Sequence, residues 1–272
     1  MPINGATELY GIIGNPVSHT LSPAMHNAAF RHLGLNKVYL PFPVSDAGAA
    51  IIGLKALGVK GVSVTIPHKQ AVIDHLERID PVAAKIGAVN TLVIAGDTVT
   101  GLNTDWLGAN AALKEFTGLA GKRVLLLGAG GSARAIGFGL LEEGARLTLA
   151  SRTPSKGMAL AQALACPWVA MESAAELPAD ILINATSVGM GQLRDESPMP
   201  AEALGRFRLV MDIVYAPLET RLLREAKAAG CKTINGLAML LYQGVAQFEL
   251  WTGAPAPVEV MRQELLAGMA GE

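Results

Sequence analysis

The sequence predicts an α/β protein made of two domains. Short apolar runs alternate with segments of helical periodicity along most of the 272 residues, an order typical of strands joined by crossover helices. Hydrophobic residues make up 51% of the chain and aromatic residues only 5%, which suits close packing of helices on sheets better than an aromatic-rich sandwich. A chain of this length can bury one large core or two smaller ones.

Composition excludes several classes of partner. The formal net charge is −1, so we expect no surface for nucleic acid or anionic membrane. No apolar run reaches the roughly 18 residues that span a bilayer, and residues 1–11 lack the layout of a signal peptide. Cys166 and Cys231 form no C-x-x-C pair and predict no disulfide framework. We therefore expect a cytoplasmic protein, as a monomer or a homodimer.

The first hundred residues predict a mostly parallel sheet. Apolar runs that read as strands lie at 9–14, 37–44, 61–66 and 90–96. A helix is expected at 22–34, with Ser22 as its N-cap and Pro23 at its first position, the residue types favoured there. This βαβ order is typical of parallel strands.

Lys69 raises a question of chemistry. Val62, Val64 and Ile66 alternate with polar residues as in a strand, and Pro67 ends it. Lys69 then precedes a helical pattern at 70–79, although the positive end of a helix dipole disfavours a cation. Either Lys69 points into solvent, or it is placed there for chemistry.

A glycine-rich turn opens the second series of elements. Gly128, Gly130 and Ala133 fit G-x-G-x-x-[G/A], directly after an apolar strand and directly before a helical pattern. Gly128 permits the tight turn, Gly130 lets the backbone approach a pyrophosphate, and the helix start supplies N–H donors. A turn that binds nothing is the alternative, but the flanking strand and helix favour a nucleotide. Further strands are expected at 180–186, 208–214 and 232–235, so the second domain is predicted to be a Rossmann-type doubly wound parallel sheet.

The next strand indicates which nucleotide binds. An NAD site carries an acid about 20 residues after the glycine turn, whereas this chain has Ser151, Arg152, Thr153 and Lys156. Two cations and two hydroxyls suit a 2′-phosphate. An ordinary basic surface loop is the alternative, but the spacing from the turn favours NADP.

The domain boundaries follow from the elements between these series. A helix at 106–116 and a loop at 117–121 form a crossing, and a long apolar helix at 237–253 is expected to pack back on the first domain. The prediction is a substrate-binding domain at 1–104 plus 239–272 and a nucleotide-binding domain at 105–238, with a ligand cleft between them.

Several polar residues lie beside apolar elements and have two interpretations each. Asn103, Thr104 and Asp105 precede a helix, and any of them could be its N-cap. Asn90 could be a buried, hydrogen-bonded residue. Gln243 and Gln247 share one face of the last apolar helix, and they either satisfy neighbouring backbone or face a ligand. The histidines match no zinc spacing, so no metal is expected and they are interpreted as structural; they are His19, His26, His32, His68 and His75.

Taken together, these stretches resemble the shikimate dehydrogenase family over nearly the whole chain. The stretches that carry the resemblance are "GNPVSHTLSPAMHN", "VTIPHK", "GAVNT", "NTD", "GAGGSARA", "NATSVGM", "DIVYAPLET" and "NGLAMLLYQ", in the family's order. The resemblance implies reversible, NADP-linked interconversion of 3-dehydroshikimate and shikimate, a small-molecule reaction on the route to aromatic amino acids.

The resemblance also implies residue roles. Lys69 and Asp105 match the catalytic pair. The substrate-binding residues implied are Thr20 and Ser22 for the carboxylate, Thr65, Asn90 and Gln243 for the ring hydroxyls, and Tyr215. The cofactor-binding residues implied are Gly128, Gly130, Gly131, Ser132, Ala133, Ser151, Arg152, Thr153, Lys156, Thr186, Val214, Gly236 and Met239.

The implied reaction answers the question of Lys69. Hydride addition to a ketone builds negative charge on its oxygen, and a cationic donor can supply a proton there. Asp105 would offset the unfavourable helix dipole and hold the amine, while Lys69 either donates the proton or mainly positions charge.

Alternatives to this function remain at the level of sequence. Thr20 stands where serine is usual in the family, and its extra methyl group beside the carboxylate leaves open a relaxed quinate/shikimate dehydrogenase. A non-catalytic NADP-binding sensor of the same fold is a further alternative, but such a protein would not need both Lys69 and Asp105.

Overall fold

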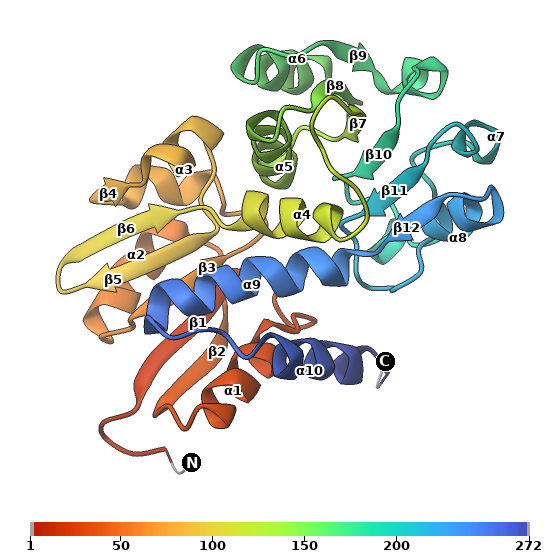
Figure 1. Cartoon of the computed structure of the whole chain (residues 1–272). Helices are drawn as coiled ribbons and strands as arrows, with labels where there is room; N and C mark the ends of the chain where they lie inside the picture. The colour runs from red at the N-terminus through yellow and green to blue at the C-terminus, as the bar shows by residue number, and fades with distance from the viewer. Residues whose placement is uncertain (1–2, 271–272) are drawn as a thin grey trace. The chain divides into compact units, whose positions relative to one another are not determined.

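The chain folds into two compact α/β units. The computed structural model describes residues 3–270 (Figure 1), and its units are residues 1–104 with 243–272, and residues 105–242. The sequence predicted the return to the first unit at residue 239. In the structure the return falls at 243, inside a continuous helix, α9 (Gly236–Thr252). The predicted α/β class is confirmed in both units.

The sheet of the first unit has six strands in the order β2-β1-β3-β5-β6-β4. Its strands are β1 (Glu8–Gly14), β2 (Lys37–Pro43), β3 (Gly61–Val64), β4 (Arg78–Ile79), β5 (Thr91–Ala95) and β6 (Thr98–Leu102). β2, β1 and β3 are parallel, as predicted. β5 runs antiparallel to β3 and β6 antiparallel to β5, while β4 is parallel to β6, so the sheet is mixed, with more parallel than antiparallel pairs. The reason is a two-residue turn, Gly96-Asp97, with Gly96 at a φ of 58°, a combination that favours a hairpin.

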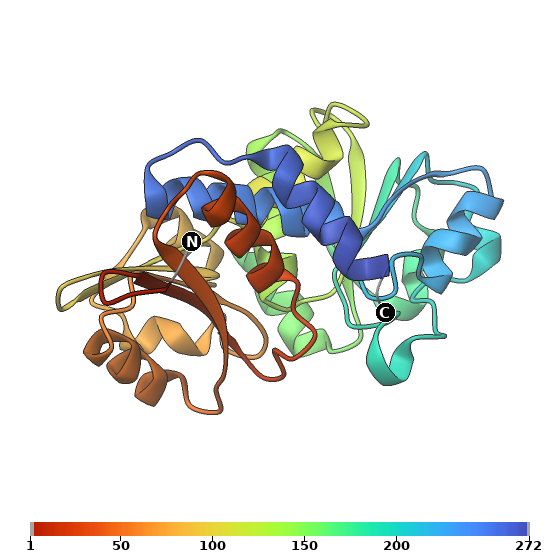
Figure 2. The same ribbon diagram turned by 90° about the horizontal axis from the view of Figure 1, so that it is seen from below.

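Helices cover this sheet on both sides. They are α1 (Ser22–His32), α2 (Ala47–Ala56), α3 (Pro81–Ile86), the second part of α9, and α10 (Val258–Ala270). On one face, α2 packs on the apolar side chains of β3, β5 and β6. Helix α10 lies alongside α1 (Figures 1 and 2). An aromatic cluster that includes Tyr10, Phe30, Tyr39, Phe248 and Trp251 fills the space between α1, α9 and the sheet.

The predicted capping role of Ser22 is wrong. Leu21 is the N-cap of α1 and Ser22 is its first helical residue, with no side-chain cap bond at this end. Ser22 is buried, and its N–H donates to Thr20 Oγ1 at 3.3 Å. The N-cap of α1 is therefore one residue earlier than predicted.

The helix predicted at 70–79 is also absent. The segment forms a short 3₁₀ helix, η1 (Ala71–His75), and then strand β4, which pairs with β6. Sheet pairing of this kind routinely overrides a local helical pattern.

The turn that carries Lys69 is held from both sides. His68 Nε2 lies 2.7 Å from the carbonyl of Val44, and the Lys69 carbonyl accepts a 2.7 Å bond from the N–H of Val89. Because no α-helix begins at Lys69, the helix-dipole argument against a cation at this position does not apply.

The second unit is built on a fully parallel sheet with the strand order β12-β11-β10-β7-β8-β9. Its strands are β7 (Arg123–Leu127), β8 (Arg146–Ser151), β9 (Trp168–Ala170), β10 (Ile181–Asn184), β11 (Leu209–Asp212) and β12 (Lys232–Ile234). Its helices are α4 (Asp105–Lys114), α5 (Gly131–Glu142), α6 (Pro154–Ala163), α7 (Ala201–Leu204), α8 (Arg221–Ala228) and the start of α9, with two short 3₁₀ helices, η2 (Met171–Glu176) and η3 (Gly191–Leu193).

Alternation along the strands sends side chains to two separate cores. Leu126 and Ile183 lie in a cluster with α4, α5 and α6. Leu125 and Leu182 lie in a cluster with α7 and α8. A sheet covered by helices on both faces, with the order reversing between β7 and β10, is doubly wound, as predicted.

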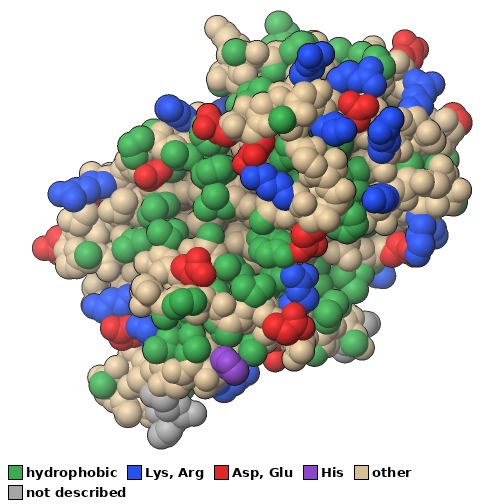
Figure 3. Space-filling view, in the orientation of Figure 1, with side chains coloured by type: hydrophobic (Ala, Val, Ile, Leu, Met, Phe, Trp, Pro, Cys, Tyr) green, Lys and Arg blue, Asp and Glu red, His purple; other side chains and the backbone are tan. Residues whose placement is uncertain are grey.

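Charged side chains of both signs are interspersed on the face shown in Figure 3. Among the described residues, no helix is long and apolar enough to cross a bilayer.

Candidate functional site

Strand directions gather polar residues at one edge of the first sheet. Because β1 and β3 are parallel, the residues that follow them lie at the same edge, and these include Ser22 and Thr65. β5 is antiparallel to β3 and β6 to β5, so the start of β5 and the end of β6 meet there as well. Asn90 directly precedes β5, and Thr104 follows β6. Four separate segments thus contribute to one polar edge.

Asn90 is the centre of this edge. Its side chain is buried, and Oδ1 accepts bonds of 2.7 Å from the Thr104 N–H and from the Thr91 hydroxyl. Its Nδ2 donates to Thr104 Oγ1 at 3.0 Å and to Gln243 Oε1 at 3.4 Å. These bonds fix the orientation of the amide. Asn90 and Gln243, both predicted as substrate-binding, are therefore brought together, and Gln243 presents its own amide beside that of Asn90.

The side-chain amides of Gln247 and Asn103 are hydrogen-bonded to neighbouring groups of the protein. Gln247 Nε2 donates to the Asn90 carbonyl at 3.1 Å and to Thr91 Oγ1 at 2.9 Å, so this glutamine satisfies its neighbours. Asn103 Nδ2 donates to the carbonyl of Ala88 at 2.8 Å, so this amide also satisfies a neighbouring backbone group. The sequence singled out neither Thr91 nor the role of Gln247, because a polar residue in a buried strand shows no partner until the strands are paired.

Thr65 and Thr20 lie in the loops after β3 and β1. A Cβ added at Gly14 would lie 2.3 Å from Thr65 Cγ2, so the glycine makes room for this threonine. Thr20 Oγ1 accepts a 3.3 Å bond from the N–H of Ser22. The two predicted carboxylate-binding hydroxyls are thus neighbours in one turn.

Lys69 and Asp105 occupy different surroundings. Lys69 is half-buried in the turn after β3, while Asp105 is buried and is the first residue of α4, where the second unit begins. A carboxylate in the first turn of a helix is stabilised by the helix dipole. The relevant dipole is therefore that of α4, acting on Asp105, and not one acting on Lys69.

The predicted cofactor residues share one edge of the second sheet. All neighbouring strands there are parallel, so the loops after β7, β8, β10, β11 and β12 emerge on the same side. These loops carry Gly128, Arg152, Thr186, Val214 and Gly236, respectively. In open α/β sheets, ligands bind at the carboxyl ends of the strands, near the point where the strand order reverses.

The glycine-rich turn has the geometry that a pyrophosphate needs. Gly128 has a φ of 119°, and a Cβ there would lie 2.7 Å from the Ala185 carbonyl oxygen. A Cβ at Gly130 would meet no described atom within 4 Å, so the space above the turn is open. Helix α5 begins at Gly131, and Ala133, in its first turn, is buried. These features fit a dinucleotide held by backbone N–H groups, with Ser132 in the first turn of the helix.

Ser151 shapes the loop that follows β8. It is buried, donates to the carbonyl of Thr153 at 3.2 Å and accepts a 3.0 Å bond from Trp168 Nε1. Arg152, Thr153 and Lys156 are exposed. The two cations therefore fit an added phosphate group, whereas the Ser151 hydroxyl is occupied within the protein.

A buried aspartate connects two of the cofactor loops. Asp212 Oδ1 accepts from Asn184 Nδ2 and from the Val214 N–H, both at 3.0 Å, and Oδ2 accepts from Thr220 Oγ1 at 2.7 Å. Asn184 Oδ1 in turn accepts a 2.7 Å bond from the Thr186 hydroxyl. Burial raises the pKa of Asp212 to about 6, although all three bonds favour its carboxylate form. The sequence assigned no role to this residue, although it opens the stretch "DIVYAPLET".

The remaining predicted residues lie at the start of α9 and after β11. A Cβ at Gly236 would lie 2.1 Å from the Ile213 carbonyl oxygen, so only glycine fits there. Met239 is buried in the core beside α4 and α5, and Tyr215 is half-buried.

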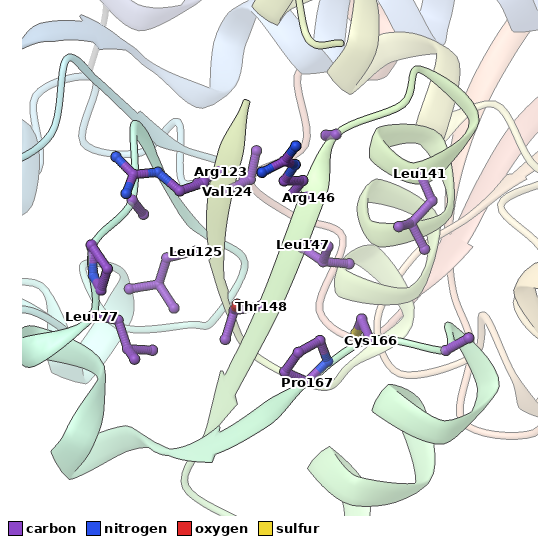
Figure 4. A pocket seen from close by; sticks show the side chains of 14 residues that line it. Arg123, Val124, Leu125, Leu141, Arg146, Leu147, Thr148, Cys166, Pro167 and Leu177 are labelled. Atoms are coloured by element: carbon purple, nitrogen blue, oxygen red, sulfur yellow. The ribbon is translucent and has the colours of Figure 1, made fainter. Parts of the chain in front are cut away.

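A cavity of about 370 Å³ lies at the other edge of the second sheet (Figure 4). Arg123, Arg146 and Cys166 line it near the amino ends of β7 and β8. Arg123 is already paired with Asp180 at 3.2 Å. Since the cavity lies opposite the glycine-rich turn, it is separate from the candidate site.

The second unit, with its glycine turn and cationic loop, defines a dinucleotide-binding α/β protein, and the first unit adds a cluster of hydroxyl and amide groups. This combination is typical of the nicotinamide-dependent dehydrogenases. Comparison with known proteins agrees with this class. Residues 12–92 match the shikimate dehydrogenase substrate binding domain, residues 110–215 match shikimate / quinate 5-dehydrogenase, and residues 236–266 match the shikimate 5′-dehydrogenase C-terminal domain. The chain belongs to the shikimate dehydrogenase family.

Individual relatives match over nearly their full length. The chain is 48% identical over 269 residues to a shikimate dehydrogenase (NADP(+)) of Thermococcus kodakarensis, covering 97% of this chain and 98% of that protein. A crystal structure of a shikimate dehydrogenase in complex with NADP⁺ superposes with a TM-score of 0.92 at 42% identity, covering 98% of both chains. The Thermus thermophilus enzyme in complex with NADP(H) and shikimate gives a TM-score of 0.89 at 38% identity, covering 96% of this chain and 99% of that one.

Proposed function

We propose that this protein is an NADP-dependent shikimate dehydrogenase, which interconverts 3-dehydroshikimate and shikimate on the route to aromatic amino acids. The observation that carries the proposal is the polar edge of the first sheet. There, hydroxyls that follow β1 and β3 lie at the same edge as Asn90 and Gln243. Such a set suits a small ligand with a carboxylate and several hydroxyls.

The proposed substrate contacts divide by chemistry. Thr20 and Ser22 supply hydroxyl donors for a carboxylate, which accepts hydrogen bonds only. Asn90 and Gln243 supply amides, which can both donate and accept, and this matches the needs of ring hydroxyls. Thr65 and Tyr215 complete the proposed set.

Lys69 and Asp105 are the proposed catalytic residues. NADPH, when bound, supplies the hydride for reduction of the ketone. The ammonium group of Lys69 stabilises the negative charge that forms on the ketone oxygen and delivers a proton to it. Asp105, the buried first residue of α4, is proposed to act together with Lys69.

The proposed cofactor residues are those of the carboxyl edge of the second sheet. The glycine turn before α5 holds the pyrophosphate, and the exposed Arg152 and Lys156 hold the 2′-phosphate. We further propose that the protein acts in the cytoplasm. We also propose that it is a monomer or a homodimer, and sedimentation of the purified chain would distinguish these two oligomeric states.

The test is an absorbance assay at the reduced-nicotinamide band. The purified full chain is mixed with shikimate and NADP, and parallel reactions replace shikimate by quinate, or NADP by NAD. We expect reduction of NADP with shikimate to have the highest kcat/KM of the four combinations. Turnover of quinate at comparable kcat/KM would instead assign the relaxed activity, and no turnover of either acid would contradict the proposal.

A further inference from the structure

Gln247 connects the two amides of the proposed substrate site. It lies on α9, one turn after Gln243, and its side chain is buried. Its Nε2 donates to the Asn90 carbonyl at 3.1 Å and to Thr91 Oγ1 at 2.9 Å. Gln247 therefore ties the helix that carries Gln243 to Asn90 and to the start of β5.

The partners of Gln247 determine which way its amide points. A backbone carbonyl can only accept a hydrogen bond, so the nitrogen end of the amide must face Asn90. The oxygen end then faces Ser63, whose hydroxyl donates to Oε1 at 2.8 Å. Because Ser63 uses its one hydroxyl hydrogen for this bond, its oxygen accepts, and Tyr39 donates to it at 2.6 Å. The orientation of the Gln247 amide is thus set from both ends.

Tyr39 is a rigid starting point for this chain of hydrogen bonds. It lies on β2 and its side chain is fully buried. Asn27 of α1 accepts from the Tyr39 N–H at 2.8 Å and donates to its carbonyl at 2.8 Å. The ring is stacked on His26, with centroids 4.6 Å apart and planes 16° apart. Ser63 therefore accepts from a hydroxyl whose ring is held in place.

The chain of hydrogen bonds ends on the side chain of Asn90. Thr91 accepts from Gln247, so its single hydroxyl hydrogen is directed to Asn90 Oδ1, to which it donates at 2.7 Å. Oδ1 also accepts from the Thr104 N–H at 2.7 Å. Since two donors hold its oxygen, the amide turns its nitrogen to the other side, where Nδ2 lies 3.4 Å from Gln243 Oε1.

Packing alone does not require an amide at residue 247. An apolar side chain of the same length would fill the space, and a buried amide is unfavourable unless it is hydrogen-bonded. Both bonds of Nε2 lead to Asn90, one directly and one through Thr91. What the amide adds to packing is therefore the placement of Asn90.

We propose that Gln247 is a positioning residue for the substrate, which holds the amide of Asn90 beside that of Gln243. This inference rests on the proposed function, in which both amides bind ring hydroxyls. Loss of the Gln247 amide leaves both substrate-binding side chains present but no longer fixed to each other, so substrate binding weakens. Neither Gln247 nor Thr91 takes part in the proposed hydride or proton transfer, so turnover at saturating shikimate should change less.

The first test is Gln247→Met, which removes the amide and keeps the length of the side chain. We expect KM for shikimate to rise about tenfold, the scale of one net hydrogen bond. Both kcat and KM for NADP should stay within about twofold of wild type, because the lost interaction contributes to binding of shikimate alone. A residue that only stabilised the fold would not separate these constants.

Thr91→Val tests the step between Gln247 and Asn90, and it keeps the inference testable if Gln247→Met folds poorly. Valine keeps the shape of threonine but neither accepts from Gln247 nor donates to Asn90. KM for shikimate should therefore rise at least about threefold, again with little change in kcat. Thr91→Ser keeps the hydroxyl and should have a KM within about twofold of wild type.

Thr252→Val is the matched control for Thr91→Val. Thr252 lies at the end of the same helix as Gln247. Its hydroxyl also both donates and accepts, to the Phe248 carbonyl at 2.7 Å and from the Ala254 N–H at 3.2 Å. These bonds lead to no residue of the proposed site, so this variant should leave KM for shikimate unchanged.

The two substitutions should also be coupled. Because Gln247 and Thr91 act on the same amide, the double variant should raise KM for shikimate at least about threefold less than the product of the single effects. Effects that simply multiply, an unchanged KM in either single variant, an equal effect of Thr252→Val, or no rescue by Thr91→Ser would overturn the inference while leaving the function intact. If the wild type does not oxidise shikimate with NADP, the proposed function itself is wrong, and the positioning role falls with it.

Discussion

Asn184 and Asp212, the last residues of two neighbouring parallel strands, are joined by a 3.0 Å hydrogen bond between Nδ2 and Oδ1. This bond ties the loop that carries Thr186 to the loop that carries Val214, because each of those residues is also bonded to one member of the pair. The carboxylate is therefore a fixed point beneath the proposed cofactor site.

Asp212→Ala should weaken both the fold and cofactor binding. Three buried donors would lose their acceptor, and each unpaired group costs about 1–3 kcal/mol. We expect a lower free energy of unfolding in urea and a raised KM for NADP, with KM for shikimate little changed. Asp180→Ala is the control, since this carboxylate lies before β10 at the opposite edge and forms an exposed pair with Arg123, worth about 0–1 kcal/mol. Equal effects of the two variants on KM for NADP would refute the role of Asp212.

His26 should make stability fall in mild acid. Burial lowers the pKa of this ring from 6.5 to about 3. Below about pH 6.5 the unfolded chain binds a proton that the folded chain does not, so stability is lost as the pH falls, by at most about 1.4 kcal/mol per pH unit. His26→Phe keeps the aromatic stack on Tyr39 and should flatten this dependence in urea unfolding between about pH 6.5 and 5. An unchanged slope would show that His26 is not the group responsible.

Asp212 should contribute a pH dependence of stability that is opposite in sign to that of His26. Its folded-state pKa is raised from 3.8 to about 6, so between these values the folded chain holds the proton more tightly. Its contribution is present below about pH 4 and is lost as the pH rises through about 6. Asp212→Asn should therefore steepen the fall of stability in acid, and urea unfolding of the variant and wild type across this range would measure the difference.

Substitution of two glycines in the same turn should have different effects, one on stability and the other on cofactor binding. Gly128→Ala forces a side chain into a positive φ and within 2.7 Å of the Ala185 oxygen, so we expect a lower Tm. Gly130 has a φ of −87°, and a Cβ there meets no described protein atom within 4 Å. Gly130→Ala should keep the wild-type Tm and raise KM for NADP, because the methyl group occupies the space of the pyrophosphate. A Gly130→Ala protein with normal KM for NADP would place the cofactor elsewhere.

Arg152→Ala should reduce kcat/KM for NADP by about tenfold, which corresponds to losing a charged hydrogen bond at the lower end of its range. Lys156→Ala should have a smaller effect, since arginine can grip a phosphate with two bonds. The weaker reaction with NAD should barely change. Arg146→Ala is the control, because Arg146 is an exposed arginine at the other end of the same strand. If Arg152→Ala lowered kcat/KM equally for NADP and NAD, Arg152 would not be a 2′-phosphate-binding residue.

Lys69→Ala should lower kcat by about 10²–10⁴-fold, the usual value of a positioned proton donor, with only mildly weaker shikimate binding. Lys85→Ala, at an exposed lysine in the last turn of α3, is the control and should leave kcat unchanged. Asp105→Asn should change kcat in the same direction as Lys69→Ala, and the double variant should lose far less than the product of the single losses. A Lys69→Ala enzyme within a few-fold of wild type would exclude Lys69 from the mechanism.

Local patterns predicted the elements whose causes are local. The alternation in β3 and the glycine turn before α5 depend on residues close together in sequence, and both were located correctly. The helix expected at 70–79 failed because β4 pairs with β6, a strand some twenty residues away. Ser22 failed as a cap because it is already the first helical residue of α1, and Leu21 is the N-cap.

In the candidate site, too, local motifs predicted some residues, while others depend on how distant strands pair. Motifs singled out Asn90 and Gln243, whose bond to each other the structure then provides. Asp212 opens the stretch "DIVYAPLET" but was assigned no role from it, and Tyr39 and Ser63 lie in no quoted stretch. A polar residue in an apolar strand looks the same whether it supports a site or only its neighbours. Their importance depends on which strands are adjacent, and that is a property of the whole sheet.

The β5–β6 hairpin has a practical consequence for labelling. Asn90 and Thr104 lie at its open end, whereas the Gly96-Asp97 turn closes the other end, five residues of strand away, or about 17 Å at the usual rise. Gly96 has a positive φ and a Cβ there would meet no described atom within 4 Å. A fluorophore or an affinity tag inserted between Gly96 and Asp97 would thus report on the molecule from a distance, while an insertion at any point within the strands would shift Asn90 relative to Thr104.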